Sequence, residues 1–292
     1  MVLMLAMVCI APAQASDASA LATILDGDAT LLRDNSRLVM AEGVRVGADD
    51  IIELGPQARF MRLEFDDGRS TGFGPGARAW LAPRLAGDRA KTAPRLYLLQ
   101  GWLKFEASKD GAAALATPWF DVSGLTRNAV LLVQPAQALV FAEAGEVVVR
   151  PWRPAGAAPI TLKAGEMLTF NGSDKPVLTS RPTPAFLQAV PRTFLDTLPA
   201  RAGKFKDQPT APKRVADLVY ADVQDWINAE PALRKPSMAR WKPLARNPAF
   251  RKSLVDDLKA HPEWQPVLFP PPPASAPRAA LPANASTTKY LP

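Results

Sequence analysis

The chain of 292 residues has one cysteine, Cys9, and one histidine, His261. Cys9 lies in a short apolar run at the N-terminus, so the remaining chain can form no disulfide and offers no thiolate to a metal. A Ser-His-Asp or Cys-His catalytic set cannot be assembled from what is left. His261 stands in His-Pro-Glu-Trp at a predicted helix end, where capping explains it better than catalysis. The sequence therefore predicts a protein that is not an enzyme and holds no metal or cofactor.

The chain also lacks any apolar run near the length of about 20 residues that a bilayer-spanning helix needs. Val2–Ile10 is apolar but short, and Ala13-Gln14-Ala15 follows it with the small-x-small pattern of a signal peptidase site. We expect a signal peptide over residues 1–15, cleaved after Ala15, rather than a buried N-terminal strand. Without disulfides or a membrane anchor, an exported chain of this size is typical of the periplasm of a Gram-negative bacterium.

Positive charge exceeds negative charge, with a net charge of +7 and a pI near 9.7. A basic exported protein could approach anionic lipid, a polyanionic cell wall or an acidic partner surface, although solubility alone also accounts for the charge. The expected compartment argues against nucleic acid as a partner.

What the chain does contain is a long β pattern over residues 20–179, with strands every 8–12 residues between turn-forming residues. Two stretches within it are similar, Ile24–Val46 and Leu139–Phe170. Gly27-Asp28 in the first takes the place of Gly145-Glu146 in the second. These stretches predict a β unit that occurs twice in one domain, and the second is expected to form a hairpin at its Gly-acid turn.

Other turns divide the rest of the β region. Asp67-Gly68 is the clearest hairpin signal. Arg95–Ala107 is the longest candidate for a strand pair, and Asp110-Gly111 ends it. Pro83–Pro94 is charged and turn-rich, which indicates a loop between two half-units.

The pattern changes after Thr179. Residues 180–214 are rich in proline and basic residues and are expected to be a linker. Residues 215–268 are expected to form a small helical module, and residues 269–292 a disordered proline-rich tail. The first helix is predicted from apolar residues at three- and four-residue spacing: Val215, Leu218, Val219, Val223 and Trp226.

The order of turns resembles the FecR-type periplasmic domain over roughly residues 20–175. The matching positions, in chain order, are Gly27-Asp28, Ala41-Glu42-Gly43, Asp49-Asp50-Ile51-Ile52, Asp67-Gly68, Tyr97–Trp102, Thr117-Pro118, Glu143–Val147 and Leu162–Glu166. The resemblance implies an all-β domain, either a sandwich or a solenoid-like double unit. In signalling members the domain follows a membrane helix and a cytoplasmic anti-sigma segment. Here it follows the expected signal peptide directly, so the chain looks more like the free-standing exported members.

Tryptophans and arginines supply the candidate binding residues. Most of the tryptophans are expected in the core, but Trp102 and Trp119 lie near turns, where an indole ring can line a sugar or peptide groove. Arg150, Trp152 and Arg153 lie where the chain leaves the second β stretch. These five residues are the predicted binding face.

The function expected from these features is a non-enzymatic binding or scaffolding protein that contacts an envelope protein or a cell-wall glycan. One alternative is an accessory role in FecR-type signalling. Another is a carbohydrate-active enzyme that uses paired carboxylates, although turn geometry explains each acid more simply. The acids concerned are Asp49, Asp50, Asp66, Asp67, Glu143 and Glu146.

Overall fold

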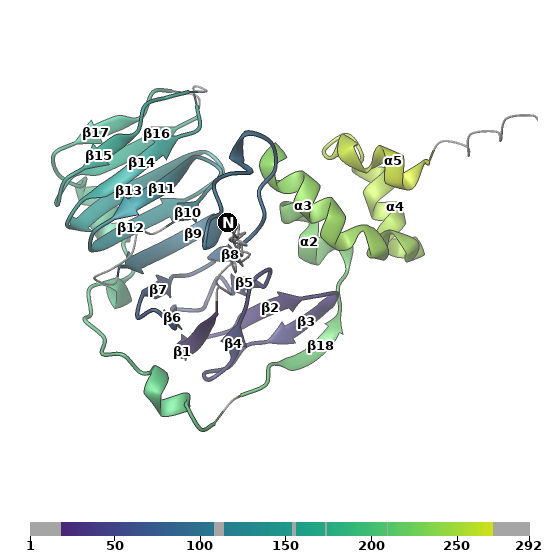
Figure 1. Cartoon of the computed structure of the whole chain (residues 1–292), viewed down its shortest axis with the longest axis horizontal. Coiled ribbons are helices and arrows are strands. Elements are labelled where there is room, and N and C mark those ends of the chain that lie inside the picture. The colour runs from purple at the N-terminus through teal and green to yellow at the C-terminus, as the bar shows by residue number, and fades with distance from the viewer. Residues whose placement is uncertain (1–18, 108–113, 154–155, 173, 209, 271–292) are drawn as a thin grey trace, which may run out of the picture.

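The computed structural model describes residues 19–107, 114–153, 156–172, 174–208 and 210–270. The expected signal peptide with Cys9, the Asp110-Gly111 turn and residues 271–292 of the expected tail lie outside these ranges. The fold is mainly β with short helices near the C-terminus, which confirms the predicted fold class (Figure 1). Within the described ranges, no helix has the length and apolar character needed to span a membrane.

The strands form two layers, which we call sheet A and sheet B. Neighbouring strands are antiparallel except for one parallel pair, β9 with β10. In spatial order, sheet A consists of β4 (Arg45–Val46), β1 (Ala20–Asp26), β6 (Phe60–Phe65), β7 (Ser70–Phe73), β9 (Leu96–Glu106), β12 (Asn128–Val133), β13 (Gln137–Ala144), β16 (Met167–Asn171) and β17 (Val177–Thr179). Sheet B consists of β18 (Lys213–Asp217), β3 (Ser36–Val39), β2 (Ala29–Arg33), β5 (Ile51–Leu54), β8 (Arg78–Leu81), β9, β10 (Leu115–Ala116), β11 (Phe120–Leu125), β14 (Val147–Pro151) and β15 (Ile160–Leu162).

The main core lies between the two layers and is filled by alternate residues of their strands. Phe120 from sheet B stacks on Phe170 from sheet A with ring centroids 4.9 Å apart. Leu31 and Leu131, one from each layer and one from each half of the chain, are both buried in this core. The two halves therefore share one hydrophobic core.

The two similar sequence stretches occupy equivalent places in the fold. In the first, β1 and β4 pair in sheet A while β2 and β3 pair in sheet B. In the second, β13 and β16 pair in sheet A while β14 and β15 pair in sheet B. Each stretch therefore passes from sheet A to sheet B and back. The glycines at the first corner, Gly27 and Gly145, both have a positive φ.

Strand β9 joins the halves because it belongs to both layers. Leu96–Gln100 pairs with β8 in sheet B, whereas Gly101–Glu106 pairs with β12 in sheet A. The strand bends at Gly101, which has a φ of +96°. A Cβ atom on Gly101 would lie 2.4 Å from Cα of Ala77, so only glycine fits both the conformation and the space.

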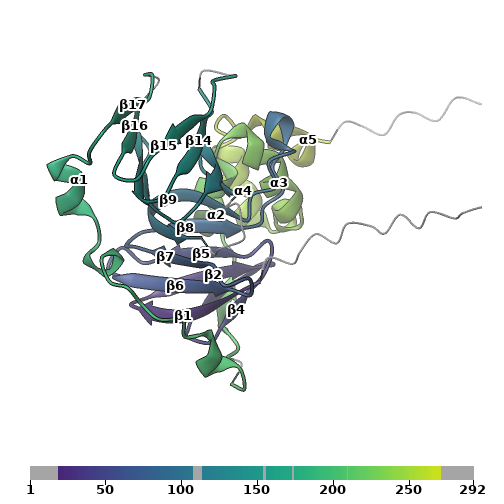
Figure 2. The same cartoon turned by 60° about the vertical axis from the view of Figure 1, so that its left-hand side comes forward.

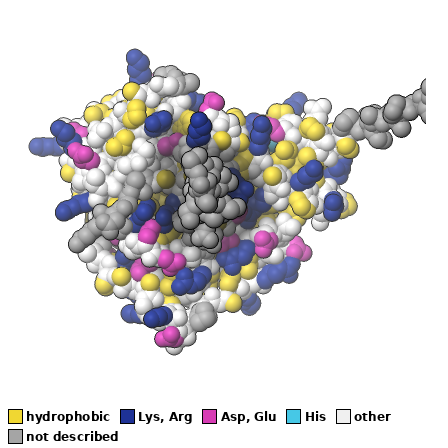
Figure 3. Space-filling view, in the orientation of Figure 1, with side chains coloured by type: hydrophobic (Ala, Val, Ile, Leu, Met, Phe, Trp, Pro, Cys, Tyr) yellow, Lys and Arg dark blue, Asp and Glu magenta, His cyan; other side chains and the backbone are white. Residues whose placement is uncertain are grey.

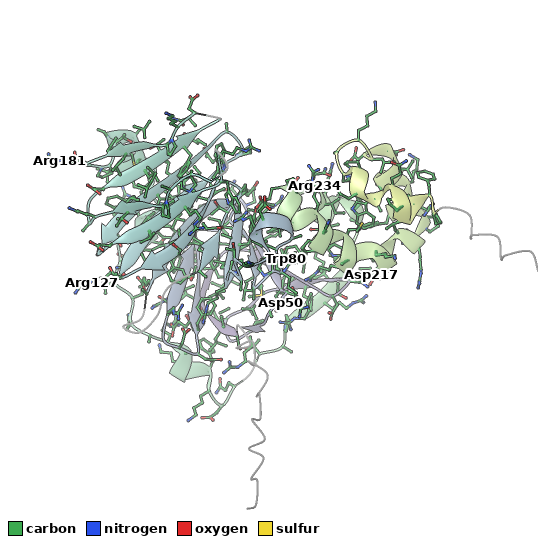
Figure 4. The ribbon with its side chains drawn as sticks, turned by 45° about the horizontal axis from the view of Figure 1, so that its top comes forward. Asp50, Trp80, Arg127, Arg181, Asp217 and Arg234 are labelled. Atoms are coloured by element: carbon green, nitrogen blue, oxygen red, sulfur yellow. The ribbon has the colours of Figure 1, made fainter. Side chains whose placement is uncertain are left out.

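Short helices cover the outer face of sheet B (Figure 1). They are α2 (Tyr220–Ile227), α3 (Pro231–Trp241), η4 (Lys242–Arg246), α4 (Pro248–Asp256), η5 (Pro262–Trp264) and α5 (Gln265–Leu268). Trp80 of β8 is at the centre of the contact, and Figure 4 shows it where strands and helices meet. Its ring packs edge-on against Trp226 at 5.8 Å and lies 6.0 Å from Trp241. Burial of these rings fixes the helices to the β layers.

The segment between β17 and β18 crosses the outer face of sheet A (Figure 2). We call residues 183–205 the strap. It contains α1 (Pro184–Ala189), η2 (Arg192–Phe194) and η3 (Ala202–Phe205). Phe186 and Phe194 are its buried anchors, 3% and 1% exposed. Each outer face of the β domain is thus covered by a different part of the chain that follows β17.

Two strand predictions are corrected. Arg95–Ala107 is not a strand pair but contains the single long strand β9. The turn at Gly145 does not close a hairpin, because it joins β13 in sheet A to β14 in sheet B. Turn residues mark where the chain reverses, but they do not show which strands become hydrogen-bonded. The hairpin predicted at Asp67-Gly68 is correct and joins β6 to β7.

The region expected to be linker followed by helix also differs. Lys213–Asp217 forms β18, which adds to the edge of sheet B beside β3. Helix α2 begins only at Tyr220, and Val215 and Val219 of its predicted apolar face are 54% and 57% exposed. An edge strand with one solvated side needs no apolar alternation, so its sequence resembles that of a linker.

Gly101→Ala should lower the free energy of unfolding by about 3 kcal/mol or more, because it adds backbone strain to a steric overlap with Ala77. Gly68→Ala is the matched control, since Gly68 has a φ of +80° but open space around its Cα. That change should cost only about 1 kcal/mol. Urea unfolding measures both variants, and equal losses would show that the bend of β9 tolerates a side chain.

Candidate functional site

A depression of about 440 Å³ opens where β9 bends. The turn between β7 and β8, the bend itself, the turn between β12 and β13 and the strap each supply part of its wall. The lining residues are Pro75, Gly76, Gln100, Gly101, Trp102, Leu132, Val133, Gln134, Pro135, Ala189 and Pro191. Its volume lies in the range of small-ligand sites, roughly 300–1,000 Å³.

Trp102 is held in this depression by close packing behind it. Gly74 permits that packing, because a Cβ atom there would lie 2.8 Å from Cβ of Trp102 and 3.1 Å from Cγ of Pro191. The ring of Phe186 in the strap lies 5.7 Å from the Trp102 ring. The indole is therefore half-buried and fixed in position, with part of its surface lining the depression.

The lining carries no charged residue and combines an indole with two side-chain amides. Gln100 donates to the carbonyl of Gly76 at 3.5 Å. The Oε1 atom of Gln134 accepts from Gln137 at 2.7 Å, and its amide nitrogen has no partner within the described ranges. Lys and Arg are spread among Asp and Glu elsewhere, over both the β region and the helices (Figure 3). The depression is thus suited to an uncharged ligand with hydroxyl or amide groups and an apolar face.

The structure brings two of the predicted binding residues to this place. Trp102 lines the depression, and the Nε1 atom of Trp119 donates to the carbonyl of Gln134 at 3.1 Å. Trp119 therefore supports the turn that forms one wall. The carbonyl of Trp119 also accepts from the backbone N–H of Trp152 at 3.0 Å, which connects this region to β14.

The other three predicted residues lie around a buried ionic cluster instead. The guanidinium of Arg89 lies 3.6 Å from the centre of the Trp152 ring. Arg150 is paired in register with Asp121 across β14 and β11 and is exposed, as is Arg153. Trp152 is thus half-buried beneath a cation, and the five predicted residues do not line a single groove.

Arg89 forms the centre of this cluster and is 2% exposed. It lies in η1 (Gly87–Arg89) and makes ion pairs with Asp121 of sheet B and Glu230 at the start of α3. Tyr97 of β9 donates to Glu230 at 2.8 Å. The cluster therefore joins the loop between the half-units, sheet B and the helical cover.

Burial dominates the electrostatics of the cluster. It raises the pKa of Asp121 and of Glu230 above their usual values, and Arg89 opposes the shift at both carboxyl groups. Burial also raises the pKa of the Tyr97 phenol well above 10. A buried cation with two carboxylates is costly to form but also costly to break, so the cluster fixes the geometry of this junction.

The acids weighed for catalysis mostly form ion pairs. Asp50 lies 2.6 Å from Arg33, Asp67 2.6 Å from Arg95, and Glu143 2.8 Å from Lys104. Asp66 also forms an ion pair, with Arg45 at 3.3 Å. Across the described ranges, no three His, Cys, Asp or Glu side chains gather as metal ligands would.

His261 is fully buried in the helical cover. One ring nitrogen lies 2.8 Å from the amide of Asn228, and the other lies 3.1 Å from the carbonyl of Leu254 in the last turn of α4. Burial lowers its pKa, which favours the neutral imidazole. Both ring nitrogens form hydrogen bonds inside the protein, so the histidine has a structural role.

Three functional candidates were missed in the sequence. Gln100 and Gln134 lie in the depression, and Arg89 lies in the ionic cluster. The glutamines belong to a strand and a turn with no distinctive pattern. Arg89 falls in the charged stretch Pro83–Pro94, where a buried arginine cannot be told from its solvated neighbours. The strongest available signal for a surface turn at this site was Gln134, which precedes Pro135 between two apolar strands.

Comparison with known proteins gives limited similarity. No family model and no curated protein matches the chain. Two crystal structures of a candidate anti-sigma factor from Parabacteroides distasonis ATCC 8503, at 2.50 Å and 1.65 Å resolution, are similar to it with TM-scores of 0.38 and 16% identity. Each match covers 48% of this chain and 64% or 65% of the other. This chain therefore spans less than two thirds of the proteins it matches, and their function is not transferred to it.

The ionic cluster gives a pH prediction with a defined sign. Burial raises the pKa of Glu230 above its ordinary value of 4.5. The carboxyl group therefore contributes fully to stability below about pH 4.5, and this contribution is lost as the pH rises through the folded-state pKa. Glu230→Gln cannot titrate at this position. The free energy of unfolding of the wild type minus that of the variant should fall as the pH rises from about 4.5.

Urea unfolding of both proteins at each pH measures this difference. The subtraction cancels the titration of shared groups that do not interact with Glu230, and Asp121→Asn in both proteins removes the coupled carboxyl group. A difference that grows with pH would show that attraction to Arg89, and not burial, dominates at Glu230.

Proposed function

We propose that this protein is an exported, non-enzymatic binding protein of the bacterial envelope that holds a cell-wall glycan in the depression beside Trp102. The observation that carries the proposal is the composition of that depression. An indole ring, two glutamine amides and no charged side chain form its lining. Sugar rings offer apolar C–H faces that stack on indole, and hydroxyl or N-acetyl groups that bond to amides.

The way the depression is built favours a site over a surface irregularity. Trp102 is fixed by Gly74 and Phe186 before any ligand arrives, so little side-chain freedom is lost on binding. The amide nitrogen of Gln134 faces no competing partner within the described ranges, because Gln137 engages only the oxygen.

The FecR-type assignment remains part of the proposal and is supported by the positions of its motifs. Gly27-Asp28 and Glu143–Val147 occupy equivalent corners where the chain passes from sheet A to sheet B. Ala41-Glu42-Gly43 and Leu162–Glu166 occupy the two corners where it returns. We propose that the chain contains an exported domain of this type.

Trp102→Ala should abolish binding of a soluble oligosaccharide of N-acetylglucosamine, because the stacking surface is lost. Gln134→Ala should weaken binding by about fivefold, the value of one net hydrogen bond of about 1 kcal/mol. Isothermal titration calorimetry and chemical shifts of the indole N–H groups measure both effects.

Gln57→Ala and Gln265→Ala are suitable controls, because both residues are exposed and lie outside the depression. Binding that survives Trp102→Ala, or an absence of binding to any cell-wall fragment, would refute a glycan site here. If proline-containing peptides bind instead, the ligand is a protein segment.

Export gives a separate prediction. A Gram-negative host should process the full chain after Ala15, so the periplasmic protein should begin at Ser16 by intact mass. Ala13→Asp with Ala15→Asp should block cleavage, because the peptidase site requires small residues. A wild-type chain that keeps Met1 and stays in the cytoplasm would contradict the proposed location.

A further inference from the structure

The strap lies over a row of charged side chains on the outer face of sheet A. Arg62 and Glu64 of β6 and Lys104 of β9 are 7%, 7% and 8% exposed beneath it. Arg62 also lies 3.8 Å from Glu64. The cations also have partners on the sheet, Glu106 at 3.7 Å from Arg62 and Glu143 at 2.8 Å from Lys104. The charged groups therefore remain paired when the strap is away, so uncovering this face is less costly than uncovering an apolar one.

These charges bind the main chain of the strap. Lys104 donates to the carbonyl of Phe194 at 2.6 Å, and Arg62 donates to the carbonyls of Leu198 and Pro199 at 2.9 and 3.0 Å. Glu64 accepts from the N–H groups that follow them in the chain, those of Arg201 and Ala202, at 2.9 and 3.0 Å. Every polypeptide has these backbone groups, so this part of the contact does not depend on sequence.

Side-chain selectivity comes from two apolar positions. Phe194 packs against Phe60 of β6 with ring centroids 6.2 Å apart. Phe186 packs between Trp102 and Phe141, at 5.7 and 5.6 Å. Hydrogen bonds to backbone groups, together with pockets for a few anchors, are a common way for proteins to recognise peptides.

Apart from these contacts, the strap is held by the ion pair of Arg201 with Glu42 at 3.6 Å and by little else. Its helices are one or two turns long, and within the described ranges it forms no strand pairing with sheet A. Leu187 and Leu195 are 58% and 72% exposed on its outer side. Such a segment can open locally while the sheet beneath remains folded.

We infer that the outer face of sheet A is a docking groove for a short, irregular segment of a partner protein, which the strap occupies in cis. The seated strap defines the chemistry of the occupant. It requires two aromatic residues eight positions apart, and an irregular backbone whose carbonyls are free to accept from Arg62 and Lys104. The inference does not depend on glycan binding in the depression.

The test uses a fluorescent synthetic peptide of residues 183–203 and the full-length protein. Phe186→Ser with Phe194→Ser in the protein should release the strap, and the variant should then bind the peptide at least tenfold more tightly than the wild type does. A peptide with serine at both anchor positions should not bind. Adding Lys104→Met to the released variant should weaken binding severalfold, whereas Lys163→Met, outside the groove, should not change it. Equal binding by wild type and released variant, or no binding by either, would overturn the inference.

Hydrogen exchange on the unmodified chain tests the inference even if the released variant fails to fold. The amides of Arg201 and Ala202, which donate to Glu64, should exchange at least 100-fold faster than the amides of β6 that pair with β1. Exchange of both sets at the same rate would show that the strap opens only with the whole domain, and the groove would then not be available to a partner.

Discussion

The bend of β9 at Gly101 is the constraint on which the rest of the structure depends. One strand serves both sheets, so the backbone must turn from one layer to the other without breaking the ladders on either side. Ala77 lies so close that a side chain on Gly101 would overlap it. The depression forms at the same place because the bend brings Gln100 and Trp102 beside the turns of neighbouring strands. The candidate ligand site is therefore a direct result of how the two halves are joined.

The two outer faces of the β domain are covered in chemically different ways. Sheet B meets the helices mainly through the tryptophan cluster of Trp80, Trp226 and Trp241. Polar contacts add to it, among them Trp226 to Glu53 at 2.9 Å and Arg240 to the carbonyl of Leu32 at 3.2 Å. Sheet A meets the strap through charges that bind backbone atoms. The first kind of contact stabilises a permanent junction, whereas the second satisfies any backbone that takes the same path. This contrast is the physical basis for assigning a structural role to one cover and exchange to the other.

Much of the architecture could be predicted from local signals in the sequence. Gly27-Asp28 and Gly145-Glu146 marked equivalent corners, and Asp67-Gly68 marked a true hairpin, because tight turns restrict residue type. Pairing between distant strands left no such signal, so the hairpin at Gly145 and the strand pair at Arg95–Ala107 were wrong. Strand β18 was missed because an edge strand needs few apolar residues.

The candidate site was predictable only in part, for a related reason. Trp102 could be named because a tryptophan near a turn is informative alone. Gln134 and Arg89 acquire meaning only from neighbours far away in the chain, such as Gln100 in the depression and Glu230 in the ionic cluster. Trp152 was expected to be accessible, but Arg89, which precedes it by 63 residues, lies over the Trp152 ring. Burial of a polar or amphipathic residue is a tertiary property that local pattern does not contain.

The covering of both faces by the chain that follows β17 also sets an order of assembly. Contacts that close the molecule join residues far apart: 136 positions separate Arg62 from Leu198, 173 separate Trp226 from Glu53, and 208 separate Arg240 from Leu32. A chain that emerges N-terminus first can form every strand except β18 while Phe60 and Trp80 are still uncovered. During that interval the nascent protein exposes aromatic side chains on two sheet faces. Avoiding aggregation then depends on rapid synthesis of the remaining chain or on a chaperone that covers these faces.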